Sequence, residues 1–281
     1  MKTCTMLIAA MFAALTATAD VTFRHIRNAT ARITYGKTTF LVDPMLAEKG
    51  RYPGFPDCFN QEVRNPKLEL PCSVDEILEG VDAVIVTHTH LDHWDEVAQK
   101  VIRKDITVFA QDETDAAAIK AQGFTDVRAM KPAAEFGGVR LTHISGTHGT
   151  AEMYDVPDFA KGLGESMGVV FSAPREKTVY LAGDTVWTPR VSKTLFDFKP
   201  DIVVLNTGYA KVLAFNDSMI MGTEDVAKAA RLAPLATIVA VHMDAISHCT
   251  VSRKNMREFV RQAGLDKRVK VPEDGETLKL K

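Results

Sequence analysis

The stretch 87-THTHLDHWDE-96 holds three histidines and three acidic residues and directly follows the apolar run 81-VDAVIV-86. A short apolar run of this kind is typical of a buried β-strand. Residues two apart in extended backbone point to the same side, so His88 and His90 can reach one metal ion. Neutral imidazole is a suitable zinc ligand. The stretch therefore predicts a metal site at the end of a strand.

The second half of the same stretch points to another position. Asp92 and His93 come where the chain is expected to turn into a helix, so they can reach a second ion. Packing does not explain so many polar groups after an apolar strand, because buried polar groups need partners. Asp95 and Glu96 are expected to be ordinary acids in the first helical turn, where the helix dipole favours them.

Three further polar residues stand at the ends of predicted strands. His148 lies just past one strand, and Asp184 and His242 each end another. Open α/β sheets place their ligands at the carboxyl ends of strands. We expect these three residues to complete the site, with the two oxygens of Asp184 able to bridge two ions.

The order of strands and helices predicts an α/β fold. Strands are expected as an early antiparallel group over 21–44, at 81–88, 106–110, 139–145, 168–173, 178–184, 201–206 and 236–242, and in a final strand and turn over 269–281. Helices are expected over 93–103, 112–123, 223–233 and 252–264. The stretch 45–72 lacks helical period, and 146–166 carries glycines and aromatics. Both are expected to be irregular, with substrate specificity in loops 45–72 and 150–167. This alternation predicts sheets covered by helices.

The first residues differ from the rest of the chain. Lys2, an apolar block over 6–15 and Ala17-Thr18-Ala19 are typical of a secretory signal peptide over 1–19, followed by a single domain over 20–281. A periplasmic or secreted protein is therefore expected, and a buried helix or a membrane anchor is the alternative. The block is well short of the ~20 residues of a spanning helix, so stable membrane insertion is not expected.

Charge and cysteine content narrow the partners and leave one question open. The formal net charge of -2, without a basic stripe, predicts no nucleic-acid partner. Cys58 and Cys72 form a disulfide or stay as free thiols, and both alternatives stand, since an exported protein permits the bond. Cys249 is expected to be a small core residue. His25 and His143 lie inside predicted strands and are expected to be structural.

These motifs together resemble the metallo-β-lactamase superfamily. The resemblance rests on the ordered set His88, His90, Asp92, His93, His148, Asp184 and His242. The stretches 145-SGTHG-149, 180-YLAGDTVW-187, 200-PDIVVLNTGYA-210 and 240-AVHMDAISHC-249 resemble the lactonase-like branch that includes ascorbate-phosphate lactonase. The resemblance implies a four-layer αββα sandwich of two mixed β-sheets flanked by helices.

The resemblance also implies roles for individual residues. It implies a first ion held by His88, His90 and His148, a second held by Asp92, His93 and His242, and Asp184 between the two. It implies that Asp43 supports the ligands from outside. Asp92 and His248 are the expected catalytic residues. For His248, substrate contact, ligation in place of His242 and a local structural role stay open.

The implied activity is hydrolysis by a dinuclear centre. A hydroxide bridging two divalent ions would cleave an ester-like or lactone bond of a small molecule. Zn²⁺ is the expected cofactor, with Mn²⁺ or Fe²⁺ as alternatives. A phosphodiesterase and a β-lactamase are alternatives among hydrolases, and a di-iron redox protein or a non-catalytic metal-binding protein stands outside them. A homo-oligomer is left open.

Overall fold

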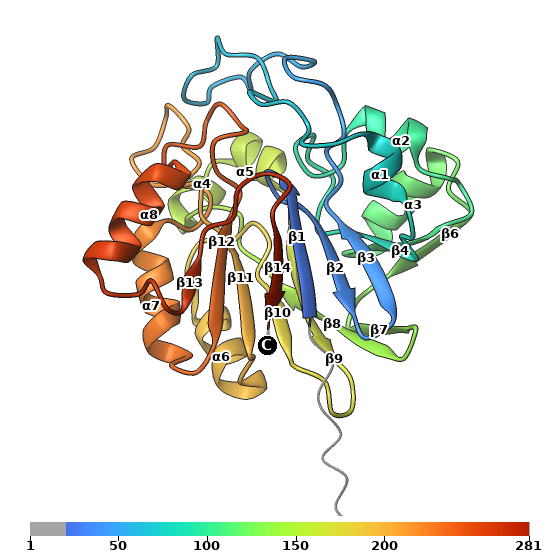
Figure 1. The fold of residues 1–281 in the computed structure, drawn as a ribbon. Helices are drawn as coiled ribbons and strands as arrows, with labels where there is room; N and C mark the ends of the chain where they lie inside the picture. The colour runs from blue at the N-terminus through green and yellow to red at the C-terminus, as the bar shows by residue number, and fades with distance from the viewer. Residues whose placement is uncertain (1–20, 281) are drawn as a thin grey trace, which may run out of the picture.

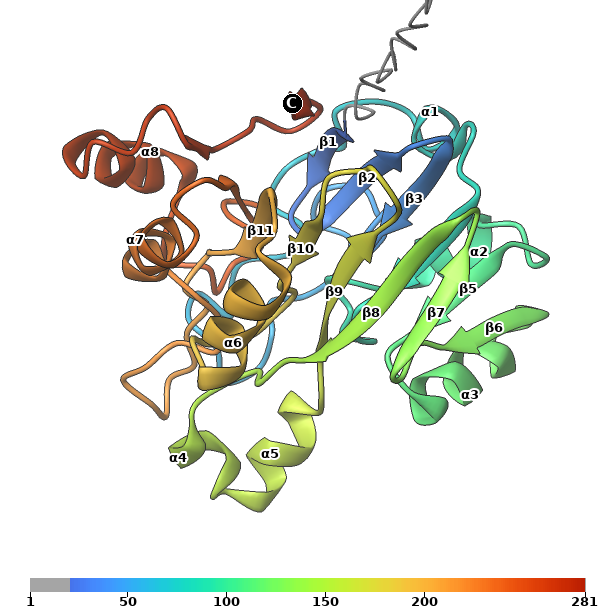
Figure 2. The ribbon, with the colours of Figure 1, turned by 90° about the horizontal axis from the view of Figure 1, so that it is seen from below.

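The computed structural model describes residues 21–280, so the expected signal peptide lies outside the described residues. Two mixed β-sheets face each other, and helices cover the outer face of each sheet (Figure 1). Figure 2 shows the molecule from below, with helices on opposite sides of the pair of sheets. The described chain therefore has the expected sandwich of two mixed sheets flanked by helices.

Each sheet has seven strands. The first sheet, in the order β14-β1-β2-β3-β4-β5-β6, consists of β1 (Val21–Arg27), β2 (Thr30–Tyr35), β3 (Thr38–Val42), β4 (Ala83–Val86), β5 (Thr107–Ala110), β6 (Asp126–Ala129) and β14 (Thr277–Leu280). The second, in the order β13-β12-β11-β10-β9-β8-β7, consists of β7 (Ala133–Phe136), β8 (Val139–Ser145), β9 (Met167–Ser172), β10 (Val179–Leu181), β11 (Ile202–Asn206), β12 (Thr237–Val241) and β13 (Val269–Lys270).

Eight helices connect and cover these strands in the described residues. They are α1 (Val74–Leu78), α2 (Glu96–Val101), α3 (Glu113–Ala121), α4 (Ala151–Tyr154), α5 (Pro157–Leu163), α6 (Pro189–Phe198), α7 (Thr223–Leu232) and α8 (Arg253–Gln262). Helices α1, α2 and α3 pack on the first sheet, and α6, α7 and α8 pack on the second.

Three apolar layers hold the sandwich together. Between the sheets, the rings of Phe40 from β3 and Phe171 from β9 meet edge to face with centroids 5.5 Å apart. Ile119 of α3 belongs to the layer outside the first sheet, and Val226 of α7 belongs to the layer outside the second. Because burial of apolar surface is the main driving force for folding, these layers fix the stacking of helix, sheet, sheet and helix.

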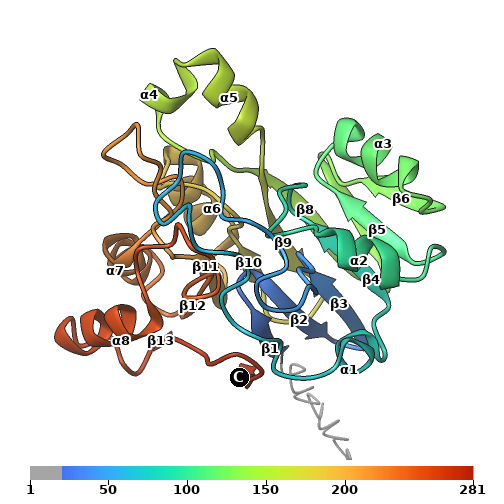
Figure 3. The same cartoon turned by 90° about the horizontal axis from the view of Figure 1, so that it is seen from above.

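The strands that carry the candidate site run in a common direction within each sheet. In the first sheet β3 pairs in parallel with β4, and in the second sheet β10, β11 and β12 pair in parallel. Their carboxyl ends therefore lie at one edge of each sheet. Figure 3 looks down on the side of the molecule where the irregular segment 45–72 and helices α4 and α5 lie.

The expectation that 146–166 is irregular is wrong. The segment forms the short helices α4 and α5. Pro157 occupies the first turn of α5, where its fixed φ and missing N–H are tolerated, and Gly164 ends the helix with φ 63°. The stretch 45–72 does lack helices and strands, as expected, and contributes only isolated bridges.

One buried arginine side chain holds the segment 45–72 in place. Arg27 of β1 donates hydrogen bonds to the backbone carbonyls of Met45, Ala47 and Leu68. The same side chain thus binds the backbone near both ends of the segment. Cys58 and Cys72 are free thiols, as is Cys249, so the disulfide alternative is not realised. No helix within residues 21–280 has the length and apolar content needed to span a bilayer.

Candidate metal centre

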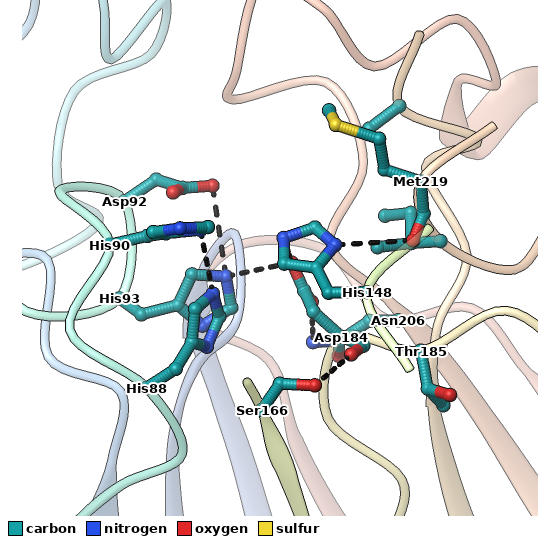
Figure 4. A network of polar contacts seen from close by, with 12 residues as sticks. His88, His90, Asp92, His93, His148, Ser166, Asp184, Thr185, Asn206 and Met219 are labelled. Atoms are coloured by element: carbon teal, nitrogen blue, oxygen red, sulfur yellow. Dashed lines mark hydrogen bonds and ion pairs between the residues drawn. The ribbon is translucent and has the colours of Figure 1, made fainter. Parts of the chain in front are cut away.

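All seven predicted ligands lie together in one cluster at the ends of the strands. Figure 4 shows the labelled side chains from the loop after β4 facing those of His148 and Asp184. Six of the seven are buried and His90 is half-buried. The cluster consists of His88, His90, Asp92, His93, His148, Asp184 and His242.

The cluster contains overlapping groups of three ligands, each with its ligand atoms within 4.8 Å of one another. His88, His90 and His148 form one group, and Asp92, His93 and His242 form another. A third group, His88, His93 and Asp184, joins these two. Nε2 of His88 lies 3.0 Å from Nδ1 of His90.

The second group is equally close-packed. Nε2 of His242 lies 3.1 Å from Nε2 of His93 and 3.3 Å from Oδ2 of Asp92. These separations fit a shared cation, because ligand atoms at zinc distance in a tetrahedron are about 3.3 Å apart.

Asp184 lies between the two groups. Its Oδ2 is 3.1 Å from Nε2 of His93, 3.6 Å from Nε2 of His242 and 3.5 Å from Nε2 of His148. Its Oδ1 accepts a hydrogen bond from the side-chain amide of Asn206 at 2.6 Å. One carboxylate oxygen therefore faces both groups while the other is held by β11.

The outer ring nitrogens of the histidines show which nitrogen faces the centre. His90 donates from Nε2 to the carbonyl of Gly162, and His148 donates from Nδ1 to the carbonyl of Met219. His93 donates from Nδ1 to the carboxylate of Asp43.

The same reading applies to His88. Thr87 uses its hydroxyl proton on Asp43, so its oxygen accepts from Nδ1 of His88. The inner nitrogens of His88, His90 and His148 can therefore carry the lone pair that a metal ion requires, and the inner nitrogen of His93 does so once its proton is released on metal binding.

Charge in the cluster also fits a cation. Burial lowers the pKa of His148 to about 4, and burial together with His93 holds the pKa of His88 well below its usual value. Burial raises the pKa of Asp184, but His93 outweighs this and holds it well below normal. Burial lowers the pKa of His93, yet Asp184 and Asp92 raise it to about 10. Buried carboxylates thus require positive charge, which a divalent ion supplies.

Several supporting residues were missed at the level of sequence. Asn206 could have been found, because it ends an apolar strand as His242 does. Nothing in the sequence pattern marked Thr87 or Ser166 as supporting residues. The hydroxyl of Ser166 donates a hydrogen bond to the backbone carbonyl of Asp184 at 2.5 Å. Asn28 also supports the ligands, since its amide donates to the carbonyl of Asp92 and its own carbonyl accepts from the N–H of His242.

The expected role of Asp95 is wrong. Asp95 is fully buried and caps α2, accepting from the N–H of Ala98 through Oδ1. Its Oδ2 accepts from the N–H of Ala47 at 2.8 Å, which ties α2 to the segment 45–72. The helix begins at Glu96 rather than at position 93, because the ligand residues form a turn before this cap.

The two histidines expected to be structural lie outside the cluster. His25 is buried in β1 and contacts the backbone carbonyls of Asn28 and Glu273. His143 lies in β8. Close to the cluster, the hydroxyl of Tyr154 accepts a hydrogen bond from the N–H of His148.

A cavity of about 370 Å³ opens onto the cluster. This volume is in the range of small-molecule sites. The lining residues from the metal cluster are His90, Asp92, His148 and Asp184. The remaining lining residues are Phe55, Pro56, Asp57, Cys58, Leu91, Asp158, Phe159, Gly162, Leu163, Val212, Met219 and His248. Among the described residues no lysine or arginine lines the cavity, and most of its wall is apolar.

Comparison with known proteins agrees with this geometry. Residues 38–243 match the family described as "Beta-lactamase superfamily domain". The chain is 44% identical over 252 residues to the UPF0173 protein YddR of Bacillus subtilis, covering 90% of this chain and 97% of that protein.

Two solved structures are similar over nearly the whole chain. A "possible metal-dependent hydrolase" from Veillonella parvula has a TM-score of 0.91 and 48% identity, covering 94% of this chain and 100% of the other. An isothiocyanate hydrolase from Delia radicum gut bacteria has a TM-score of 0.88 and 45% identity, covering 92% and 98%. With the clustered ligands, these similarities show that the chain belongs to the beta-lactamase superfamily and is a metal-dependent hydrolase of the metallo-β-lactamase fold.

Proposed function

We propose that this hydrolase uses two divalent metal ions, with Zn²⁺ as the first candidate. The observation that supports it is the position of Asp184, whose Oδ2 faces both groups of three ligands. His88, His90 and His148 would hold one ion, and Asp92, His93 and His242 the other. Two such ions, when bound, would supply a water-derived nucleophile at neutral pH and polarise the substrate.

Side chains around this centre would position the attacking water and the substrate. Asp92 belongs both to the cluster and to the cavity wall, so its carboxylate can orient the attacking water or take its proton. Asn206 keeps one oxygen of Asp184 occupied, which leaves the other directed at the centre. The apolar wall holds the uncharged part of the substrate and excludes bulk water.

We propose isothiocyanates with an apolar substituent as the substrate class. The apolar cavity suits such molecules, and the structure that shares 45% identity is an isothiocyanate hydrolase. Water would add to the central carbon of R–N=C=S to give a thiocarbamic acid. That acid breaks its C–N bond to give the amine R–NH₂ and carbonyl sulfide, so all atoms balance.

The lining chemistry makes a phosphodiester substrate less suitable. Asp57 and Asp158 add acidic groups to the cavity, and the described lining has no lysine or arginine to pair with a phosphate. Lactones and simple esters are uncharged electrophiles that also suit the cavity. The lactonase activity expected from the sequence is therefore the second candidate.

A metal analysis and a substrate panel test the proposal together. The purified protein should carry two metal ions per chain and convert benzyl isothiocyanate to benzylamine. The panel should include a lactone, an aryl ester, nitrocefin and a phosphodiester, with Asp184→Ala as the inactive control. One ion per chain would overturn the dinuclear part, and faster turnover of a lactone would transfer the assignment to that class.

Export is a further part of the proposal and rests on the pattern in residues 1–19. Expression of the full sequence in a Gram-negative host should yield periplasmic protein that begins at Asp20. Mass spectrometry of the intact protein would show this directly, and an uncleaved cytoplasmic product would contradict it.

A further inference from the structure

His248 is a buried imidazole in the cavity wall that belongs to neither group of metal ligands. It is 6% exposed and lines the cavity beside Phe55, with the two ring centroids 5.1 Å apart. Backbone hydrogen bonds fix the main chain of His248 as well. Its carbonyl accepts a hydrogen bond from the N–H of Lys211, and the next residue, Cys249, forms an isolated antiparallel β-bridge with Ala210.

The side chain of His248 differs from the ligand histidines in its hydrogen bonding. His90, His93 and His148 each have a partner at the outer ring nitrogen. Nδ1 of His248 is buried and has no hydrogen-bond partner within residues 21–280, although the residue lines the cavity. A buried polar group without a partner is costly and usually has a functional reason.

We propose that His248 is a catalytic residue that hydrogen-bonds to the polar end of the bound substrate. This inference rests on the proposed function and deepens it, because the polar end is then the N=C=S group. Phe55 packs against the imidazole, and both residues line the cavity that would receive the substrate.

The chemistry of the reaction gives this hydrogen bond its value. When water adds to the central carbon, negative charge builds up on the nitrogen and sulfur of the substrate. A fixed N–H donor in a dry site stabilises such charge more in the transition state than in the ground state. Burial lowers the pKa of His248 to about 4, so at neutral pH the ring is uncharged and donates from one nitrogen.

The test replaces the ring while keeping its volume. His248→Phe preserves the packing on Phe55 and removes both nitrogens. His248→Gln and His248→Asn restore an amide donor near the positions of Nε2 and Nδ1, so their comparison shows which nitrogen acts. The matched control is His143→Phe, because His143 lies outside the cavity lining. Each variant is measured for metal content, melting temperature, kcat and KM with benzyl isothiocyanate.

We expect His248→Phe to lower kcat by about 10- to 100-fold with little change in KM. Metal content should stay as in the wild type, and the melting temperature should stay equal or rise, since an unpartnered polar group is removed. One of the two amide variants, His248→Gln or His248→Asn, should have a kcat about tenfold higher than that of His248→Phe. A purely structural role predicts loss of metal or stability and no recovery, and that result would overturn the proposal.

Thiocyanate separates this inference from the proposed function, because it presents the N=C=S atoms without being hydrolysed. Its dissociation constant is measured by calorimetry with the zinc-loaded wild type and His248→Phe. If no isothiocyanate is hydrolysed but His248→Phe binds thiocyanate several-fold more weakly, the proposed function fails and the role of His248 as a ligand-binding residue stands. Equal binding by both proteins, or no binding by either, overturns the inference.

Discussion

Nδ1 of His93 donates a hydrogen bond to Oδ2 of Asp43 across 2.9 Å, and both side chains are buried. The contact fixes the ring so that Nε2 faces the centre, and the carboxylate makes the imidazole a more basic ligand. Asp43→Asn keeps the shape but removes the charge. We expect it to weaken metal binding by about 10- to 100-fold, as measured by competition with a chromogenic chelator.

The control for this change is Asp82→Asn. Asp82 is also a carboxylate that accepts a backbone hydrogen bond, from the N–H of Thr39. It is exposed, and none of its hydrogen bonds within the described residues involves a metal ligand. It should leave metal affinity unchanged. Equal affinity of Asp43→Asn and wild type would show that the contact does not support the ligand.

Asn28 links both ends of the second ligand group. Its amide donates to the carbonyl of Asp92 at 3.0 Å, and its φ is 59°. Asn28→Gly keeps this backbone conformation accessible and removes only the amide. We expect one of two bound metal ions to be lost at a several-fold lower chelator concentration than in the wild type. Stepwise metal release followed by mass spectrometry would measure this, and simultaneous release of both ions would contradict it.

Removal of metal should destabilise the folded chain. The buried carboxylates of Asp92 and Asp184 make ion pairs only with histidines among the described residues, so without metal their charge is balanced by protonated imidazoles rather than by a divalent cation. A ligand present at 1,000 times its dissociation constant contributes about 4 kcal/mol. We expect dipicolinate to lower the melting temperature by roughly 10 °C, with recovery on adding Zn²⁺. An unchanged melting temperature in fully metal-free protein would refute the coupling.

Phe159 of α5 lines the cavity and packs against Phe215, with ring centroids 5.1 Å apart and the rings tilted by 53°. Phe159→Ala removes apolar contact area for the substituent of the substrate. We expect KM for benzyl isothiocyanate to rise about tenfold, while KM for methyl isothiocyanate changes little. Phe196→Ala is the control, since Phe196 is 75% exposed on α6 and outside the cavity lining. A similar rise for both substrates would argue against a role of Phe159 in specificity.

The sequence predicted the parts of the molecule that depend on local pattern. The polar residues His148, Asp184 and His242 were recognisable because each follows an apolar run, and apolar strands place such residues at one edge. Asp95 was misjudged because its burial depends on the segment 45–72, which is far away in the chain. Helix α5 was missed because its glycines and Pro157 favour irregular structure locally, while tertiary contacts and the position of the proline at the first turn allow a helix.

The ligands also divide according to the two sheets. His88, His90, Asp92 and His93 follow β4 of the first sheet, whereas His148, Asp184 and His242 follow β8, β10 and β12 of the second. Each group of three ligands contains members from both halves. Metal affinity therefore depends on how the two sheets are docked, and any motion that slides one sheet over the other breaks both coordination spheres at once. In folding, such ions would bind with full affinity only after the two sheets have docked, because each ion takes ligands from both sheets.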